Sequence, residues 1–151
     1  MVVGIILEDD SERTVRAESV LGIASIVIIL GSLVPWRTVA GFHTNALYTW
    51  SGNAAFVGGL IVLFATTVSY KIYRSTLLQR YRPYTDAGLG LLGSVFSLIG
   101  AFNYLLILES DATPFVGLYL TIIGGFLGVV SAVWVYTQEI SPIPKGMSGS
   151  V

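Results

Sequence analysis

Few residues in this chain have the types and the spacing that catalysis or metal binding requires. The 151 residues include no cysteine, which excludes disulfides, thiolate nucleophiles and cysteine-ligated zinc or iron–sulfur sites. His43 is the only histidine, and a lone histidine is a weak candidate for a metal site. Without a cysteine or a second histidine, the usual nucleophile–base pairs can be built only from hydroxyl groups. We therefore expect neither an enzyme nor a bound cofactor.

Polar residues inside the apolar parts of the chain are the remaining candidates for a functional path. Asn53, Thr67 and Asn103 could line a route for a small neutral solute or a lipid. The structural alternative is that such hydroxyls bond to their own helix and such amides to a neighbouring helix. The apolar runs contain no Asp, Glu, Lys, Arg or His, and proton relays and ion-coupled carriers normally need one. A pump or a proton-driven transporter is therefore not expected.

Four long apolar runs must position these residues. Charges are absent from 19–36, 51–70, 87–108 and 112–138, and each run reaches the roughly 18 apolar residues of a spanning helix. Backbone groups at membrane depth must pair within each segment, which favours helices over strands. We predict an all-α integral membrane protein, a four-helix transmembrane bundle of two antiparallel hairpins. Its domain covers 17–138, with spans at 17–36, 51–73, 87–108 and 114–137.

The composition leads to the same fold class. The chain is 54% hydrophobic and 11% charged, against roughly 25% charged in an average soluble domain. A net charge of −1 argues against nucleic acid as a partner, since Lys and Arg supply most of that affinity. We expect residues 1–16 to form an acidic, solvated cytoplasmic leader and 139–151 a flexible cytoplasmic tail.

The basic residues predict the orientation. Only Arg37 lies between the first and second spans, and the positive-inside rule then places both termini in the cytoplasm, as N-in/C-in. We expect a multi-pass protein of the cell membrane. A cleaved signal peptide ending near 38–40 is the alternative, but the long apolar run and the long charged leader disfavour it. Seven basic residues lie on the other side: Arg13, Arg16, Lys71, Arg74, Arg80, Arg82 and Lys145.

Small residues recur at helical spacing in the last two spans. Such residues let membrane helices pack closely. One interpretation is that these stripes seal a single bundle, and the other is that the 117–128 stripe contacts another subunit. The residues concerned are Gly117, Thr121, Gly124, Gly125 and Gly128 in the fourth span, and Gly93 and Ser97 in the third.

The segment from Arg37 to Trp50 is the most informative polar-side loop. It mixes aromatic with small polar residues and could fold as a small hairpin over the bundle. Exposed aromatics mark either protein interfaces or membrane anchors. The loop is thus a contact surface for a partner outside the cell or an interfacial lid. Its candidate contact residues are Arg37, Phe42, His43, Tyr48 and Trp50.

The end of the first span carries a resemblance. Gly31-Ser32-Leu33-Val34-Pro35-Trp36 is similar to the Gly-x-x-x-Pro-Trp motif that closes the first helix in small prokaryotic four-span proteins of uncharacterised function. A glycine-rich last helix, here 117–125, accompanies it. The acidic leader also resembles proteins of salt-loving archaea. The resemblance implies the four-helix architecture and no activity.

Two functional hypotheses follow. The first is an accessory or structural subunit of a membrane assembly, with membrane lipids and a protein partner or a second copy as its contacts. The glycine stripes, the aromatic loop and the absence of charges within the spans favour it. The alternative is passive transport of a small neutral solute or a lipid. The basic loop between the second and third spans suits anionic lipid head groups, although orientation alone explains its charges.

Overall fold

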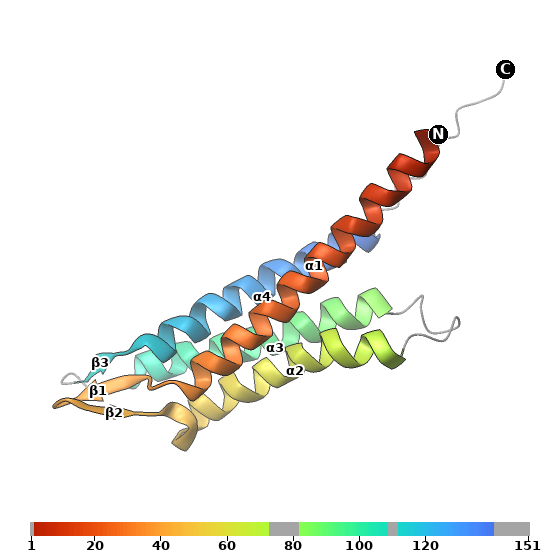
Figure 1. Ribbon diagram of the computed structural model, residues 1–151. Coiled ribbons are helices and arrows are strands. Elements are labelled where there is room, and N and C mark those ends of the chain that lie inside the picture. The colour runs from red at the N-terminus through yellow and green to blue at the C-terminus, as the bar shows by residue number, and fades with distance from the viewer. Residues whose placement is uncertain (1, 73–81, 109–111, 141–151) are drawn as a thin grey trace.

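The computed structural model describes residues 2–72, 82–108 and 112–140 and is built on four helices (Figure 1). The basic residues at 74 and 80 and the tail at 141–151 lie outside this description. Successive helices run side by side in opposite directions. This confirms the all-helical prediction. The helices are α1 (Val2–Leu33), α2 (Trp50–Ile72), α3 (Arg82–Leu106) and α4 (Val116–Ile140).

The four helices form a ring in which each helix packs against two neighbours. α1 and α3 both contact α2 and α4 extensively and barely contact each other. The N-terminal part of α1, which holds the acidic leader, continues as helix past the ends of the other helices (Figure 1). This geometry leaves one outward face on every helix.

Three helices are long and apolar enough to cross a membrane. Their apolar stretches are Trp50–Thr67, Tyr84–Leu106 and Val116–Thr137, with mean hydropathies of 1.3, 1.7 and 2.1. α1 contributes a shorter apolar stretch, Ala17–Leu33. The stretch in α3 begins at Tyr84 rather than at 87 and so includes Asp86, whose side chain is buried.

Helix boundaries differ from the predicted ones for local physical reasons. α3 begins at Arg82 rather than at 87, because Pro83 sits in the first turn, where a helix needs no backbone N–H. α4 begins at Val116 rather than at 114 because Thr113 and Pro114 form a strand. α2 begins at Trp50, where the Thr49 hydroxyl accepts the Gly52 N–H at 3.2 Å as an N-cap.

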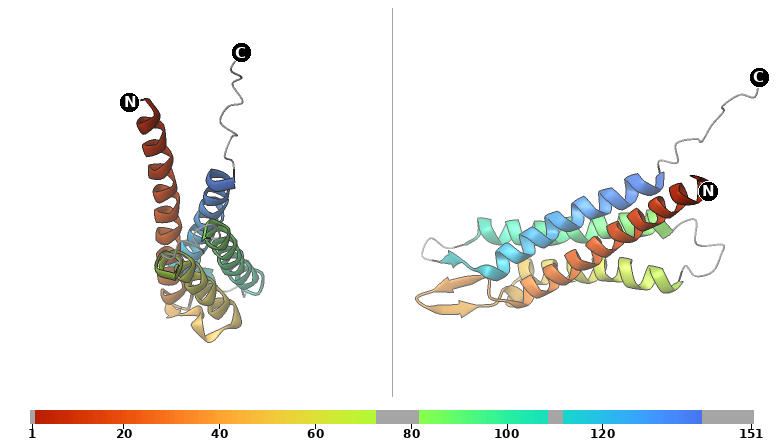
Figure 2. Two further views of the ribbon diagram at one scale, coloured as in Figure 1. Left: turned by 90° about the vertical axis from the view of Figure 1, so that its right-hand side faces the viewer. Right: turned by 45° about the horizontal axis from the view of Figure 1, so that its top comes forward.

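A small antiparallel sheet closes one end of the bundle. The strands β1 (Arg37–Val39), β2 (Phe42–Thr44) and β3 (Thr113–Pro114) are ordered β2-β1-β3. Ala40 and Gly41 both have positive φ, 48° and 84°, as a two-residue type I′ hairpin turn requires. With the short 3₁₀ helix η1 (Ala46–Tyr48), this cap lies opposite the N-terminus and the end of α4 (Figure 2).

The largest buried cluster lies directly beneath the cap. The Trp36 side chain, from the end of the Gly-x-x-x-Pro-Trp motif, is 0% exposed. It meets the Tyr104 ring edge-on, with centroids 5.1 Å apart. The rest of the cluster is Ala46, Ala55, Ala101 and Leu118.

Candidate functional site

The residues of the Gly-x-x-x-Pro-Trp motif join the end of α1 to the start of α4. The indole Nε1 of Trp36 donates to the Gly31 carbonyl at 2.8 Å. The Trp36 carbonyl accepts the Phe115 N–H at 2.7 Å, and the Pro35 carbonyl accepts the Gly117 N–H at 3.0 Å. A Cβ on Gly31 would approach the Thr121 backbone nitrogen to 2.7 Å. The motif thus fixes the end of α1 against the start of α4.

The small-residue stripe of α4 is covered by α1 and α3 of the same chain. A Cβ on Gly117 would come within 2.7 Å of the Gly31 carbonyl oxygen, and one on Gly124 within 3.0 Å of the Ile28 nitrogen. On the other side, Gly125 faces the Leu98 side chain of α3. The five stripe residues, Gly117, Thr121, Gly124, Gly125 and Gly128, are all buried. The stripe therefore serves contacts within the bundle.

The small residues of α3 form the matching contact with α2. A Cβ on Gly93 would come within 2.6 Å of the Gly58 carbonyl oxygen. The buried Ser97 hydroxyl donates to the Ala55 carbonyl of α2 at 3.0 Å and also to its own helix, at Gly93, at 3.0 Å. Gly93 and Ser97 thus hold α2 and α3 at close range.

The cap is held rigidly on the bundle by side-chain hydrogen bonds. The Asn45 amide nitrogen donates to the Leu33 carbonyl at the end of α1, at 2.5 Å. Its oxygen accepts the Leu47 N–H at 2.9 Å and caps η1. Trp36 N–H donates to the Thr44 carbonyl at 3.0 Å. The hairpin and η1 are therefore fixed relative to the helices beneath them.

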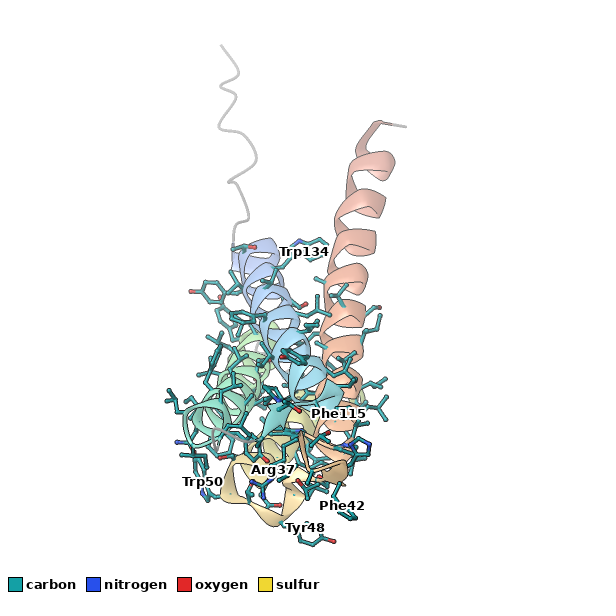
Figure 3. All side chains as sticks on the ribbon, turned by 90° about the vertical axis from the view of Figure 1, so that its left-hand side faces the viewer. Arg37, Phe42, Tyr48, Trp50, Phe115 and Trp134 are labelled. Atoms are coloured by element: carbon teal, nitrogen blue, oxygen red, sulfur yellow. The ribbon has the colours of Figure 1, made fainter. Side chains whose placement is uncertain are left out.

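Three predicted contact residues project from this rigid cap. Tyr48 is 95% exposed, Phe42 77% and Trp50 63%. They lie at the same end of the molecule, with Phe42 and Tyr48 at its tip and Trp50 at its side (Figure 3). Trp50, the first residue of α2, meets the Phe96 ring of α3 edge-on, with ring centroids 6.3 Å apart. The three rings form what we call the aromatic cap surface.

The other two predicted contact residues are tied into the cap itself. Arg37 is half-buried, and its Nε donates to the Thr44 hydroxyl at 3.0 Å across the hairpin. His43 shares a 2.9 Å hydrogen bond between its Nδ1 and the Thr38 hydroxyl. Its ring lies 4.6 Å from that of Phe115, which precedes α4. Both residues therefore link cap elements to each other.

The three residues that could have lined a transport route do not converge. Asn53, Thr67 and Asn103 are all exposed on the outside of the bundle. The Thr67 hydroxyl donates to the Leu63 carbonyl of its own helix at 2.6 Å. The Asn103 side-chain oxygen accepts a hydrogen bond from the Ser51 hydroxyl at 3.0 Å. This arrangement favours packing roles for these residues over a shared path.

Asp86 is a buried acidic residue of α3. The helix begins one turn earlier, at Arg82, and the Asp86 side chain is 2% exposed. The neighbouring Ala87 packs with Ala17 of α1 and Val135 of α4. Asp86 belongs to an unbroken stripe of inward-facing residues on α3, and this stripe is the signal from which its burial could have been predicted.

The described residues thus offer an interior filled by small side chains and an exterior with one rigid aromatic end. Hydroxyls in the interior mostly bond back to their own helix, as Ser94 does to Gly90 at 2.7 Å and Thr121 to Gly117 at 2.9 Å. Comparison of the chain with protein-family models, with curated proteins and with solved structures gives no match.

Proposed function

We propose that this chain is an integral membrane protein with four spans and cytoplasmic termini, and that it serves as an accessory or structural subunit of a membrane assembly. The observation that carries the role is the aromatic cap surface. Three large rings project from a hairpin and a helix start whose backbones are already hydrogen-bonded. The proposed role is contact with a partner, and it is not catalytic.

Rigid exposed aromatics are suited to protein recognition. Tyr and Trp bury a large area with few rotatable bonds, so a partner gains contact area at a low cost in side-chain entropy. The cap adds to this because the segment that carries Phe42 and Tyr48 is already ordered by the sheet and by Asn45. Little backbone ordering is then needed on binding.

Length and hydropathy support α2, α3 and α4 as three spans, and we assign α1 as the fourth. Its apolar stretch Ala17–Leu33 has a length of about 25 Å at 1.5 Å per residue, close to the roughly 30 Å of the hydrocarbon core. The helix continues past both the stretch and the bundle. Arg13 and Arg16 of α1, Lys71 of α2 and Arg82 of α3 lie on helix ends away from the cap, and this favours cytoplasmic termini.

The test is extraction in a mild detergent from the native membrane followed by intact-complex mass measurement. We expect the wild-type chain in a complex of defined mass, containing another protein or a second copy. The triple variant Phe42→Ser/Tyr48→Ser/Trp50→Ser should fold, because these side chains are exposed, and should leave the complex. A matched control replaces Phe64, Phe102 and Tyr119, which are exposed on the helices.

Three outcomes would contradict the proposal. One is a wild-type chain extracted only as a monomer. Another is a cap variant that stays in the complex as well as the control does, which would make the rings membrane anchors. A complex lost equally in the cap variant and in the control would place the contact on the helices instead.

A further inference from the structure

The strand β2 forms a free edge of the small sheet in the cap. The sheet order is β2-β1-β3, so β2 has a neighbouring strand on one side only. All three of its residues, Phe42–Thr44, are exposed. Among the described elements, none lies along β2 on the side away from β1 (Figure 1 and Figure 2). The main chain of β2 is therefore open to another molecule along that side.

The hairpin turn determines which backbone groups of β2 face outward. In a two-residue turn the flanking residues, here Val39 and Phe42, exchange N–H and C=O hydrogen bonds with each other. The groups of His43 then point away from β1, and those of Thr44 point back toward it. The Thr44 carbonyl accepts the Trp36 N–H at 3.0 Å, in agreement with this alternation. His43 thus presents both its N–H and its C=O at the free edge.

Asn45 adds a second donor to this edge. Its backbone is extended, with φ of −83° and ψ of 141°, so its N–H points to the same side as the groups of His43. The Asn45 N–H donates no hydrogen bond to a described residue. Two donors and one acceptor, spaced as in a strand, are the groups with which another extended backbone pairs.

The opposite edge of the sheet lacks such a donor. β3 places Thr113 opposite Thr38 and Pro114 opposite Arg37. Because Arg37 bonds to β2, the outward position of β3 falls on Pro114, which has no N–H. Proline and charged residues commonly keep free edges from pairing, and β2 contains no proline and no Asp, Glu, Lys or Arg. Of the two edges, β2 is thus the one that can receive a strand.

A second copy of the chain in the same membrane does not fit this edge. Two identical strands pair symmetrically when they are antiparallel, and their two-fold axis then stands perpendicular to the sheet. The strands β1 and β2 run lengthwise with the helices (Figure 1), so this axis crosses the helices. The second copy would be inverted relative to the first, whereas copies of one membrane protein share an orientation.

We infer that the β2 edge binds an extended segment of a different protein, which adds as an antiparallel strand outside the membrane. One residue of that segment exchanges N–H and C=O bonds with His43, and the residue two positions before it accepts the Asn45 N–H. The next residue lies opposite Phe42, whose 77% exposed ring favours an aromatic or β-branched neighbour. The inference rests on the proposed subunit role and specifies how the partner is bound.

The test uses the complex extracted from the native membrane in a mild detergent and follows single backbone amides by hydrogen exchange. The amides of His43 and Asn45 should exchange at least about tenfold more slowly in the complex than in the chain separated from it. Those of Phe42 and Thr44, which already bond to β1, report whether the hairpin itself changes. Contact through the aromatic rings alone would leave exchange at His43 and Asn45 unchanged.

Two variants isolate the outward donor. His43→Pro removes an N–H that does not face β1, so the β1–β2 ladder remains. His43→Thr is its matched comparison, since both variants lose the imidazole contacts with Thr38 and Phe115 and only proline lacks the N–H. Equal midpoints of unfolding show that both fold. We expect about tenfold less His43→Pro than His43→Thr in the complex.

Cross-linking identifies the neighbour of the edge. A photoactivatable side chain is introduced at Phe42 or at Thr44, and the linked peptides are mapped. Both should label one segment of a different protein, at residues about two positions apart and in reverse order. The same side chain at Phe64, exposed on α2, is the control and should not label that segment.

The inference is overturned if the His43 and Asn45 amides exchange equally fast in the intact complex and in the separated chain. Equal recovery of His43→Pro and His43→Thr, or cross-links to a second copy, would also overturn it. A wild-type chain extracted only as a monomer removes the subunit role and this inference together. A complex that loses the triple cap variant, with both amides unprotected in wild type, keeps the subunit role and rejects strand addition alone.

Discussion

Gly58 of α2 and Gly93 of α3 lie directly against each other. A Cβ on Gly58 would lie 2.5 Å from the Gly93 carbonyl oxygen, and a Cβ on Gly93 would lie 2.6 Å from that of Gly58. Real Cβ atoms do not approach backbone oxygens this closely, so neither helix has room for a side chain here. This reciprocal contact brings Ser97 within hydrogen-bonding distance of Ala55 across the helix pair.

The reciprocal contact predicts that alanine at either glycine is destabilising. Gly58→Ala and Gly93→Ala should each lower the free energy of unfolding by about 1–3 kcal/mol, as overpacking does. The double variant should cost less than the sum, because both changes force the same helices apart. Thermal unfolding in detergent, followed by circular dichroism, measures this. Gly88→Ala is the control, and an equal loss there would contradict the prediction.

The small-residue stripe of α4 predicts that a large side chain introduced there destabilises the bundle. Gly124→Leu would place its side chain against Ile28 of α1 and should destabilise the bundle by several times RT, about 2–3 kcal/mol. Gly22→Leu, in open space on α1, should leave the midpoint of unfolding unchanged. A Gly124→Leu protein with normal stability but altered oligomeric mass would show that the stripe contacts another subunit instead.

Trp36 is expected to stabilise the junction of α1 and α4 in two separable ways. Trp36→Phe removes the hydrogen bond to the buried Gly31 carbonyl and should cost about 1–3 kcal/mol. Trp36→Ala also empties the space against Tyr104 and Leu118 and should cost about 3–5 kcal/mol. The two unfolding midpoints distinguish these contributions. Equal midpoints would mean that the ring contributes nothing beyond the hydrogen bond.

The hairpin turn predicts a stabilising substitution. Ala40 has φ of 48°, a left-handed conformation that asparagine tolerates far better than alanine. Ala40→Asn should therefore stabilise the cap by about 0.5–1 kcal/mol, and Gly41→Val, at φ of 84°, should destabilise it. Hydrogen exchange of the β1–β2 amides reports the effect. Faster exchange in Ala40→Asn would contradict the predicted stabilisation, and unchanged exchange would show that the turn does not limit opening of the hairpin.

The proposed topology predicts which ends of the molecule face outward. The chain has no cysteine, so single cysteines can be introduced without background labelling. Tyr48→Cys, at the most exposed cap position, should react with a membrane-impermeant maleimide in intact cells. Ser148→Cys, in the tail, should react only after the membrane is opened. The reverse pattern would invert the orientation, and labelling of both would imply an odd number of spans.

The helical architecture and the approximate position of each helix could be predicted from the amino-acid sequence alone. Long runs without charge and with few polar residues predict helices because the cost of desolvation falls on each residue of a segment separately. It does not depend on which other segments lie beside it. The hairpin over the bundle was readable for a similar local reason, since 37–44 contains a short run with a glycine turn. Boundaries were less predictable, because Pro83 fits either a linker or a first helical turn.

Which surface each residue occupies depends on how the helices pack, and the sequence pattern did not predict it. Phe42, Tyr48 and Trp36 are all aromatic residues of one loop region, yet two are exposed and Trp36 is buried under the cap. Likewise, Gly88 and Gly93 are both glycines of α3, but one faces open space and the other a neighbouring backbone. Local sequence determines where a helix forms. Which face of that helix turns inward depends on close packing with the other three helices.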